Sequence, residues 1–376
     1  MNIIDYLRWR GEIPFRISPF NDVDNVILSQ ISYVNWEGIL NYNSIMTLPE
    51  AWQRYQDLEE TRKMNPNLIL MVDEAANSER FKKVRLMYYV REIDAAKEMQ
   101  FSALTMYLPD NTYYVAFEGT ESSVIGWKED FNMTYMFPIP SQKMAYDYLA
   151  NLKFRPFSKV RVGGHSKGGN LAIYASVMLE NSDRIINVYN NDGPGFSKEF
   201  LDSKKYKKIK PKIVSLIPHS SVIGQLMNND IDEKIVLCST NDLAWQHIVY
   251  SWEVDVTKFA EADKTSKESK FFQEALNHWN NDMSTEQKQI FMNTFYETIT
   301  DLGITEANQI FKYKLTLFKA LMNKLKNYDE RTRKIVIDVI KALLQSNVNA
   351  FYNTYVENRL KKYERTLLNE NTSSER

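Results

Sequence analysis

The sequence has one cysteine, four histidines, and no long apolar run. The single cysteine, Cys238, excludes an internal disulfide framework, and its apolar surroundings predict a buried, inert thiol. The balance of 47 basic against 48 acidic residues excludes a bulk field that would recruit nucleic acid or an anionic membrane. No stretch approaches the ~18 apolar residues of a transmembrane helix, and the charged start MNIIDYLRWR is unlike a signal peptide. These absences predict a soluble, cytoplasmic protein.

Apolar patterning predicts a mixed, mostly parallel sheet. The chain has 376 residues, of which 44% are hydrophobic, so it can bury a large core and form more than one unit. Three β-prone runs predict antiparallel strands, and four later runs alternate with helical segments at roughly 25-residue spacing, as in parallel α/β winding. In order, these runs are 85–93, 99–108 and 112–117, followed by 159–162, 185–189, 212–217 and 233–238.

Helical spacing of apolar residues predicts three helices within the α/β part of the chain. They are expected at 22–34, capped by Asn21 or Asp22, at 49–61 with Pro49 in the first turn, and at 142–152.

From Ser284 onward the composition changes, because only one glycine and no proline follow. The apolar positions there predict an antiparallel hairpin of two long helices, preceded by a shorter helix that begins with a Ser284–Gln287 capping box. The expected division is an α/β domain of residues 1–280 and a helical extension of residues 281–376.

A glycine-rich junction, VRVGGHSKGGN at 160–170, joins a strand to a helix. Gly164, Ser166 and Gly168 form the G-x-S-x-G pattern of a nucleophile elbow. A serine at the tip of such a turn takes strained backbone angles, and only neighbours without side chains let the strand and helix close around it. The alternative is a glycine-rich βα turn without chemistry.

A serine nucleophile needs a base, and His247 is the favoured candidate because elbow hydrolases follow the chain order serine, acid, histidine. His165 adjoins the serine and points away from it, whereas His219 comes earlier in the chain than His247. The acid must precede His247. Asp192 is favoured over Asp242 because it stands at the carboxyl end of a strand, in a turn that fixes its direction.

The loop after the strand at 112–117 reads FEGTESS and should lie at the same sheet edge as the elbow. The backbone N–H groups of Thr120 and Lys167 could therefore form an oxyanion hole, although a plain loop is the alternative. The sequence has neither a His/Cys cluster with metal-ligand spacing nor a phosphate-cradling loop, so no metal and no cofactor are expected.

Four motifs, FEGTESSVIGWKEDFN, GGHSKGGNLA, YNNDGPGF and WQH…SW, together resemble an uncharacterised bacterial family of the α/β-hydrolase superfamily, related to class 3 (fungal-type) lipases. The resemblance spans roughly residues 5–256. It implies the α/β-hydrolase fold, Ser166 as nucleophile, His247 as base, Thr120 and Lys167 as oxyanion donors, and Asp130 as a structural carboxylate in a W-x-x-D element with Trp127. In one respect the chain departs from those lipases: where they carry the triad aspartate, it reads SSVIG at 220–224, which makes Asp192 the available replacement.

The sequence thus predicts a serine esterase or lipase-like hydrolase that cleaves a carboxylic ester or thioester of a small-molecule or lipid acyl substrate through an acyl-enzyme. Aromatic residues at 127–138 could line an acyl pocket, act as a lid, or belong to the core. One alternative is a non-catalytic scaffold on the hydrolase fold, with a protein partner bound through the C-terminal helices. The other is an acyltransferase that uses an acceptor other than water.

Overall fold

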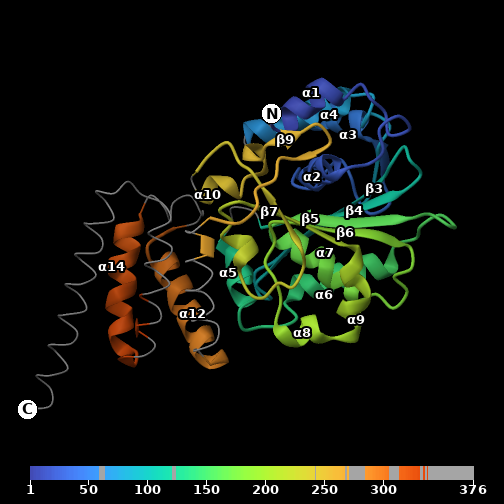
Figure 1. Cartoon of the computed structure of the whole chain (residues 1–376). Helices are drawn as coiled ribbons and strands as arrows, with labels where there is room; N and C mark the ends of the chain where they lie inside the picture. Colours follow the sequence, from blue (N-terminus) through green and yellow to red (C-terminus); the bar gives the residue numbers. More distant parts are fainter. Residues whose placement is uncertain are drawn as a thin grey trace, which may run out of the picture.

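The computed structural model describes residues 1–58, 64–120, 124–241, 243–266, 269–270, 284–304, 313–330, 333–334 and 337. Its centre is an eight-stranded sheet in which β1 to β8 lie side by side in sequence order. Figure 1 shows helices covering both faces of this sheet. The fold is therefore the α/β architecture with a mixed, mostly parallel sheet that the sequence predicts.

The first half of the sheet is antiparallel. β2 pairs with β3, and β3 pairs with β4 in a register that joins Ala103 to Phe117 and Tyr107 to Tyr113. The three predicted strands and their tight turn are confirmed to within two residues at each end. An additional strand, β1, precedes them and is too short for alternation to reveal. The bounds are β1 Ile45–Thr47, β2 Arg85–Asp94, β3 Met99–Tyr107 and β4 Tyr113–Phe117.

The second half is parallel, and its connecting helices lie on one face. The parallel strands lie side by side in sequence order, and crossovers between parallel strands are right-handed. The connecting helices therefore lie on the same side of the sheet. Figure 1 shows these helices together below the sheet. The carboxyl ends of the parallel strands consequently share one edge. The strands are β5 Val160–His165, β6 Ile185–Asn191, β7 Ile213–Pro218 and β8 Glu233–Val236, and the helices are α6 Pro140–Asn151, α7 Lys167–Met178, α8 Lys198–Asp202 and α9 Lys204–Ile209.

Four N-terminal helices cover the opposite face (Figure 1). The helix predicted at 22–34 begins after an Asn21 capping box but ends at Ile31. The helix predicted at 49–61 has Pro49 in its first turn and Thr47 as its cap, and residues 59–63 lie outside the described part. The first and fourth helices were not predicted from the sequence. The four are α1 Ile3–Arg10, α2 Asp22–Ile31, α3 Leu48–Gln56 and α4 Pro66–Asn77.

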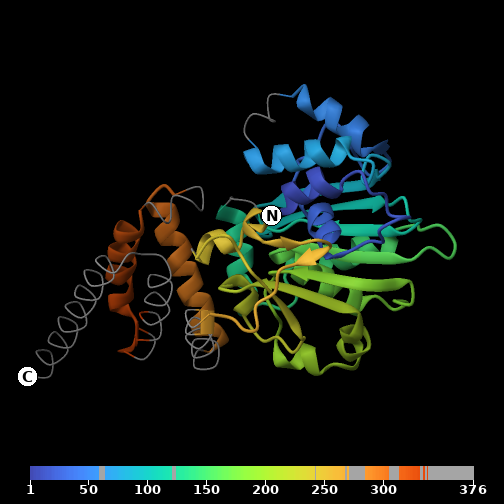
Figure 2. The same cartoon turned by 45° about the horizontal axis from the view of Figure 1, so that its top comes forward.

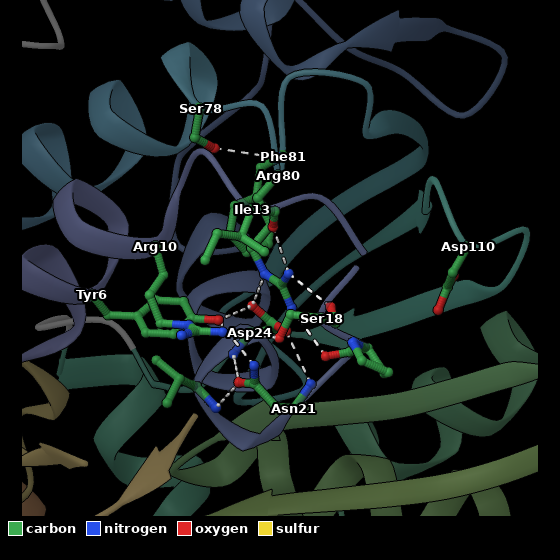
Figure 3. A network of polar contacts seen from close by, with 12 residues as sticks. Tyr6, Arg10, Ile13, Ser18, Asn21, Asp24, Ser78, Arg80, Phe81 and Asp110 are labelled. Atoms are coloured by element: carbon green, nitrogen blue, oxygen red, sulfur yellow. Dashed lines mark hydrogen bonds and ion pairs between the residues drawn. The ribbon is translucent and has the colours of Figure 1, made fainter. Parts of the chain in front are cut away.

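A buried ion pair joins α2 to the turn that follows α4 (Figure 3). The Arg80 Nε donates to Asp24 Oδ1 at 2.7 Å, and both side chains are buried. The remaining guanidinium donors reach the carbonyl oxygens of Ile13, Ser18 and Pro19. Every charge taken out of water here thus has protein partners, which is the condition for burying it without a large penalty.

The described part of the C-terminal extension contains α12 Thr285–Asp301 and α14 Lys314–Lys324. The predicted capping box at Ser284 and Gln287 is present. In the described residues α12 has 17 residues and α14 has 11. The second helix of the predicted hairpin, at 340–355, and the domain boundary at 280–281 lie outside the described residues.

The extension packs against α5 (Val124–Asn132), as the two views of Figures 1 and 2 agree. The Phe295 ring of α12 meets the Phe131 ring of α5 edge to face, with centroids 5.3 Å apart. Beside this pair, the Lys128 ammonium lies 4.3 Å from the centroid of the Tyr296 ring. Aromatic and cation–π contacts therefore join the two helices.

The segment after β8 consists of short helices and strands, and it contains His247. Cys238, predicted to be buried, is only half-buried, and its backbone forms an isolated antiparallel β-bridge with that of Trp252. Burial raises the pKa of its thiol to about 12, in keeping with an unreactive group. The remaining short elements are η2 Lys210–Lys212, η3 Ile223–Gln225, α10 Leu243–Gln246, η4 Val249–Ser251, β9 Val254–Asp255, β10 Lys258–Phe259 and η5 Leu325–Asn327.

Candidate active site

Ser166 stands alone between the end of β5 and the start of α7. Its φ of 57° and ψ of −133° lie in a region that residues with a side chain rarely adopt. Its backbone N–H donates to Asn191 O at 2.9 Å, which holds the strained turn against the end of β6. Backbone strain of this kind costs free energy and persists only where the surroundings enforce it. The G-x-S-x-G segment therefore has the geometry of a nucleophile elbow.

The two elbow glycines are required by close backbone packing. A Cβ on Gly164 would lie 2.3 Å from the carbonyl carbon of Gly168, and a Cβ on Gly168 would lie 2.1 Å from the Phe117 carbonyl oxygen. The ends of β4 and β5 and the first turn of α7 thus approach one another more closely than any side chain permits. This approach leaves the serine at the edge where the parallel strands end.

Asp192 and His247 lie in contact although 55 residues separate them. The His247 Nδ1 is 2.6 Å from Asp192 Oδ2, and the carboxylate is completely buried. The other carboxylate oxygen, Oδ1, accepts hydrogen bonds from Ser221 Oγ at 2.5 Å and Gly224 N at 3.1 Å. These donors replace the water that the aspartate has lost and fix which oxygen faces the imidazole.

The backbone on both sides of His247 is anchored. The Trp252 indole donates to Gln246 O at 2.8 Å, and the Gln246 side chain accepts from Ser220 N at 2.8 Å. Trp252 is fully buried, whereas Trp245 is 63% exposed. The histidine is accordingly held against the end of β7, with 23% of its side chain exposed.

The serine and the imidazole lie at the same edge without being bonded. Ser166 adjoins Asn191 through the pairing of β5 with β6, and Asp192 is the next residue of that chain. Within the described part of the chain, no hydrogen bond joins the Ser166 hydroxyl to His247. Hydrogen bonds of this type are often long in unliganded sites and tighten when substrate binds.

The loop after β4 approaches the elbow, as its place in the sheet predicts. A Cβ on Gly119 would lie 2.5 Å from His165 O and 3.1 Å from Ser166 Cβ. The next residue, Thr120, donates from its hydroxyl to Asp130 Oδ1 at 2.7 Å, which ties the loop to α5. Burial and the adjacent Glu129 raise the pKa of Asp130 to about 6. Residues 121–123 lie outside the described part.

The Lys167 side chain turns away from the serine into the core. Its ammonium donates to Glu129 Oε2 at 2.8 Å and to Gln100 O at 2.9 Å, and both members of the ion pair are buried. Glu129 also accepts from the backbone N–H of Ser141, at the start of α6. The first residue of α7 is thus locked to α5 and α6. Its own N–H belongs to the first turn of α7, where backbone donors have no partner within the helix.

Several residues of this edge were missed by the sequence analysis. Glu129 stands beside Asp130, and that acidic pair was the only available signal. Ser221 and Gly224 occupy the segment that was taken only as a departure from lipases, yet they hold Asp192. Of the other histidines, His219 lies 3.3 Å from Ser220 Oγ through its Nδ1, and His278 lies outside the described residues, as does Asp242.

Two of the aromatic residues at 127–138 make ring contacts with other parts of the chain. Phe131 contacts Phe295, and Phe137 contacts Phe200 with ring centroids 5.2 Å apart. The side chain of Trp127 lies outside the described part. A hollow of ≈ 310 Å³ does exist, but Val160 and Ile185 in its lining place it at the amino ends of β5 and β6, away from the elbow.

The described residues contain no group of three potential metal-ligating side chains and no helix long and apolar enough to cross a membrane.

Comparison with known proteins places the chain in a family. The Mbeg1-like family profile matches residues 75–297, more than half of the sequence. The chain belongs to the Mbeg1-like family. The Mbeg1-like region runs from the end of α4 into α12 and contains the elbow, the Thr120 loop, Asp192 and His247.

Two solved lipase structures are similar to the Mbeg1-like chain. An M37 lipase shares 15% identity, over 54% of this chain and 68% of that one, with a TM-score of 0.35. The native propeptide complex of Rhizomucor miehei lipase shares 14% identity, over 62% of this chain and 82% of that one, also at 0.35. No curated protein matches. Identities and TM-scores of this size do not assign an activity.

Proposed function

We propose that this chain is a serine hydrolase of the esterase or lipase type, which cleaves a carboxylic ester or thioester through an acyl-enzyme on Ser166. The observation that carries the proposal is the 2.6 Å contact between His247 Nδ1 and the buried Asp192, at the sheet edge where the strained Ser166 stands. Base and acid come from distant parts of the chain, as in a Ser-His-Asp triad.

The proton path follows from this contact. Asp192 accepts a hydrogen bond from the Nδ1–H of His247, so Nε2 of the neutral imidazole carries the lone pair. Nε2 takes the Ser166 hydroxyl proton as Oγ bonds to the substrate carbonyl carbon, and it returns that proton to the departing alcohol or thiol. Water then attacks the acyl-enzyme by the same route, which releases the acid and restores the serine.

The oxyanion would be bound by the backbone N–H groups of Thr120 and Lys167. The Thr120 loop lies against the elbow and is tied to α5, while Lys167 opens α7, where free N–H groups and the helix dipole favour negative charge. Because the Lys167 ammonium is buried with Glu129, it does not bring a competing charge to this hole. Asp130 would serve as a structural carboxylate.

The Asp192 arrangement favours an enzyme over a scaffold. Burying the Asp192 carboxylate and holding its backbone at a φ of 53° both cost free energy. The carboxylate contacts His247 and accepts hydrogen bonds from Ser221 and Gly224, and the Asp192 backbone N–H donates to Leu216 O. A fold kept only for docking would have no need of an acid paired with a partly exposed imidazole. The small-molecule or lipid acyl substrate, the cytoplasmic location and a partner at the C-terminal helices remain predictions.

Fluorophosphonate labelling of the purified full chain tests the proposal. Wild-type protein is expected to be labelled, and Ser166→Ala is expected to lose all labelling because the attacking oxygen is gone. Ser158→Ala, which alters a serine of the loop before β5, is the matched control and should label normally. A folded wild type that resists labelling would leave only the scaffold.

Asp192→Asn tests the acid separately. The amide can still accept from Ser221 and Gly224 through Oδ1 but cannot hold His247 in the required tautomer, so the rate of p-nitrophenyl ester hydrolysis is expected to fall by ~10⁴-fold. An unchanged rate would remove Asp192 from the triad. Product analysis in the presence of alcohols separates hydrolysis from acyl transfer, because a transferase would yield a new ester.

A further inference from the structure

His165, the residue between Gly164 and Ser166, contacts the proposed base in two ways. Its ring lies against the His247 ring with centroids 4.5 Å apart and planes inclined by 32°. Its Nε2 lies 2.8 Å from the His247 carbonyl oxygen. Side chain and main chain of His247 are thus both touched by the residue that precedes the nucleophile.

These contacts determine the protonation of His165. A carbonyl oxygen can only accept, so Nε2 must carry a proton. The other nitrogen, Nδ1, lies 3.0 Å from the Tyr33 hydroxyl, which can donate to it. Neutral His165 with Nε2–H therefore satisfies both contacts at once, donating to His247 O and accepting from Tyr33.

Tyr33 connects this pair to the loop after β4. It follows α2 in the chain, and its hydroxyl oxygen lies 3.0 Å from His165 Nδ1 and 3.3 Å from His165 O, so these two acceptors share its single hydrogen. A Cβ on Gly119 would lie 2.1 Å from the Tyr33 oxygen, so that the loop carrying Thr120 passes directly over the phenol. Burial and Glu118 raise the pKa of Tyr33 well above its ordinary value, which keeps the hydroxyl a donor.

We propose that His165 is a positioning residue, held by Tyr33 as the neutral Nε2–H tautomer, and that it fixes the main chain and ring of His247 for reaction with Ser166. The proposal rests on the proposed function. It links three parts of the site that the sequence separates widely: the elbow, the base and, through Tyr33, the oxyanion loop.

The neutral state of His165 matters to the base. Burial and the neighbouring His247 lower the pKa of His165 well below its ordinary value. The ionisable groups facing the cluster are His247 and Tyr33 themselves, with Asp192 behind His247, and Glu118, Asp130 and Tyr250 near Tyr33. If His165 were charged, it would repel the imidazolium that His247 becomes during turnover; as a neutral ring it does not.

A pair of substitutions tests the positioning role by hydrolysis of p-nitrophenyl acetate. His165→Leu removes the donor to His247 O and is expected to lower kcat by ~10²-fold while changing KM by less than ~3-fold, because the base is misplaced rather than the substrate. His165→Gln carries an N–H near the position of Nε2 and is expected to recover most of that loss. Equal rates for wild type and His165→Leu, or equal losses in both variants, would overturn the proposal.

The tautomer is tested by nitrogen NMR of ¹⁵N-histidine protein, which needs no turnover. The His165 signals, assigned by their absence in His165→Gln, are expected to show a protonated Nε2 and a bare Nδ1 from pH 8 to pH 5.5. Titration near pH 6.5, or an Nδ1–H tautomer, would contradict the proposal. If Ser166 fails to label, the hydrolase function falls, and this spectrum still decides what His165 does.

Discussion

Two buried ion pairs, Arg80–Asp24 and Lys167–Glu129, lie on opposite faces of the sheet and hold different parts of the main chain in place. In both, each side chain is at most 1% exposed, and additional hydrogen bonds complete the arrangement. Arg80 reaches three loop carbonyls in the layer of N-terminal helices. Lys167 reaches one strand carbonyl and, through Glu129, the start of α6.

The difference lies in which backbone each pair fixes. Asp24 belongs to α2 and is bonded to Tyr6, so that its pair joins α2 to α1 and to the turn that follows α4 (Figure 3). Lys167 follows Ser166 directly, and Glu129 precedes Asp130, which holds Thr120. The second pair therefore positions both proposed oxyanion donors. The effect of a buried ion pair on function thus depends on which main-chain groups it positions, rather than on how much the pair itself stabilises the fold.

Glu129→Gln should show the largest effect. Loss of the carboxylate charge leaves Lys167 buried without its counter-ion, so the free energy of unfolding is expected to fall by ~3–5 kcal/mol. Because both oxyanion donors are loosened, kcat for ester hydrolysis of the folded protein is expected to fall by ~10²-fold. Urea unfolding and steady-state kinetics below the transition measure the two effects separately.

The matched control is Asp24→Asn, which breaks the other pair in the same way. It is expected to lower stability by a similar amount and to leave kcat of the folded protein within ~3-fold of wild type. If Asp24→Asn lowered kcat as far as Glu129→Gln does, the proposed distinction between the two pairs would be wrong.

Asp130, next to Glu129, adds a pH dependence of folding stability on the site side of the sheet. Its pKa of about 6 in the folded protein lies above the ordinary value of 3.8, so the native state holds this proton more tightly than the unfolded chain does. The group therefore favours folding at low pH, and this contribution is lost as pH rises from about 4 to about 6.

Asp130→Asn removes the titration while retaining an oxygen that can accept from Thr120. The stability of the variant relative to wild type is expected to increase between about pH 4 and 6 and to level off above that range. Denaturant unfolding of both proteins across the range measures the difference, in which other groups largely cancel. A relative stability that decreases with pH would contradict the raised pKa.

The nucleophile elbow and the central strands of the sheet could be predicted from the sequence. The elbow could be predicted from a short stretch of sequence, because the G-x-S-x-G pattern between a strand and a helix is typical of a nucleophile elbow. The strands could be predicted because their apolar runs are unambiguous. The contact of Asp192 with His247 followed from chain order and strand ends, although the catalytic roles themselves stay a proposal.

What escaped prediction depends on three-dimensional contacts between distant segments. Nothing in the sequence indicates that Lys167 turns inward to Glu129, since a lysine beside a serine could equally face the site. The contact of Tyr33 with His165 joins residues 132 positions apart. The apolar periodicity likewise does not show that α2 ends at Ile31 rather than at Val34.

Phe295→Ala should show the smallest effect, since it acts on the outer side of α5. It removes an edge-to-face contact with Phe131 that contributes ~1 kcal/mol beyond the buried area. Faster limited proteolysis of the helical extension is expected, with kcat within ~3-fold of wild type because Glu129 and Asp130 still hold α5 from within. Ile290→Ala, at a side chain that is 46% exposed on the same helix, is the control and should change neither measurement. A loss of kcat as large as that of Glu129→Gln would mean that the extension itself positions the oxyanion loop, and the contrast between an inner and an outer side of α5 would fail.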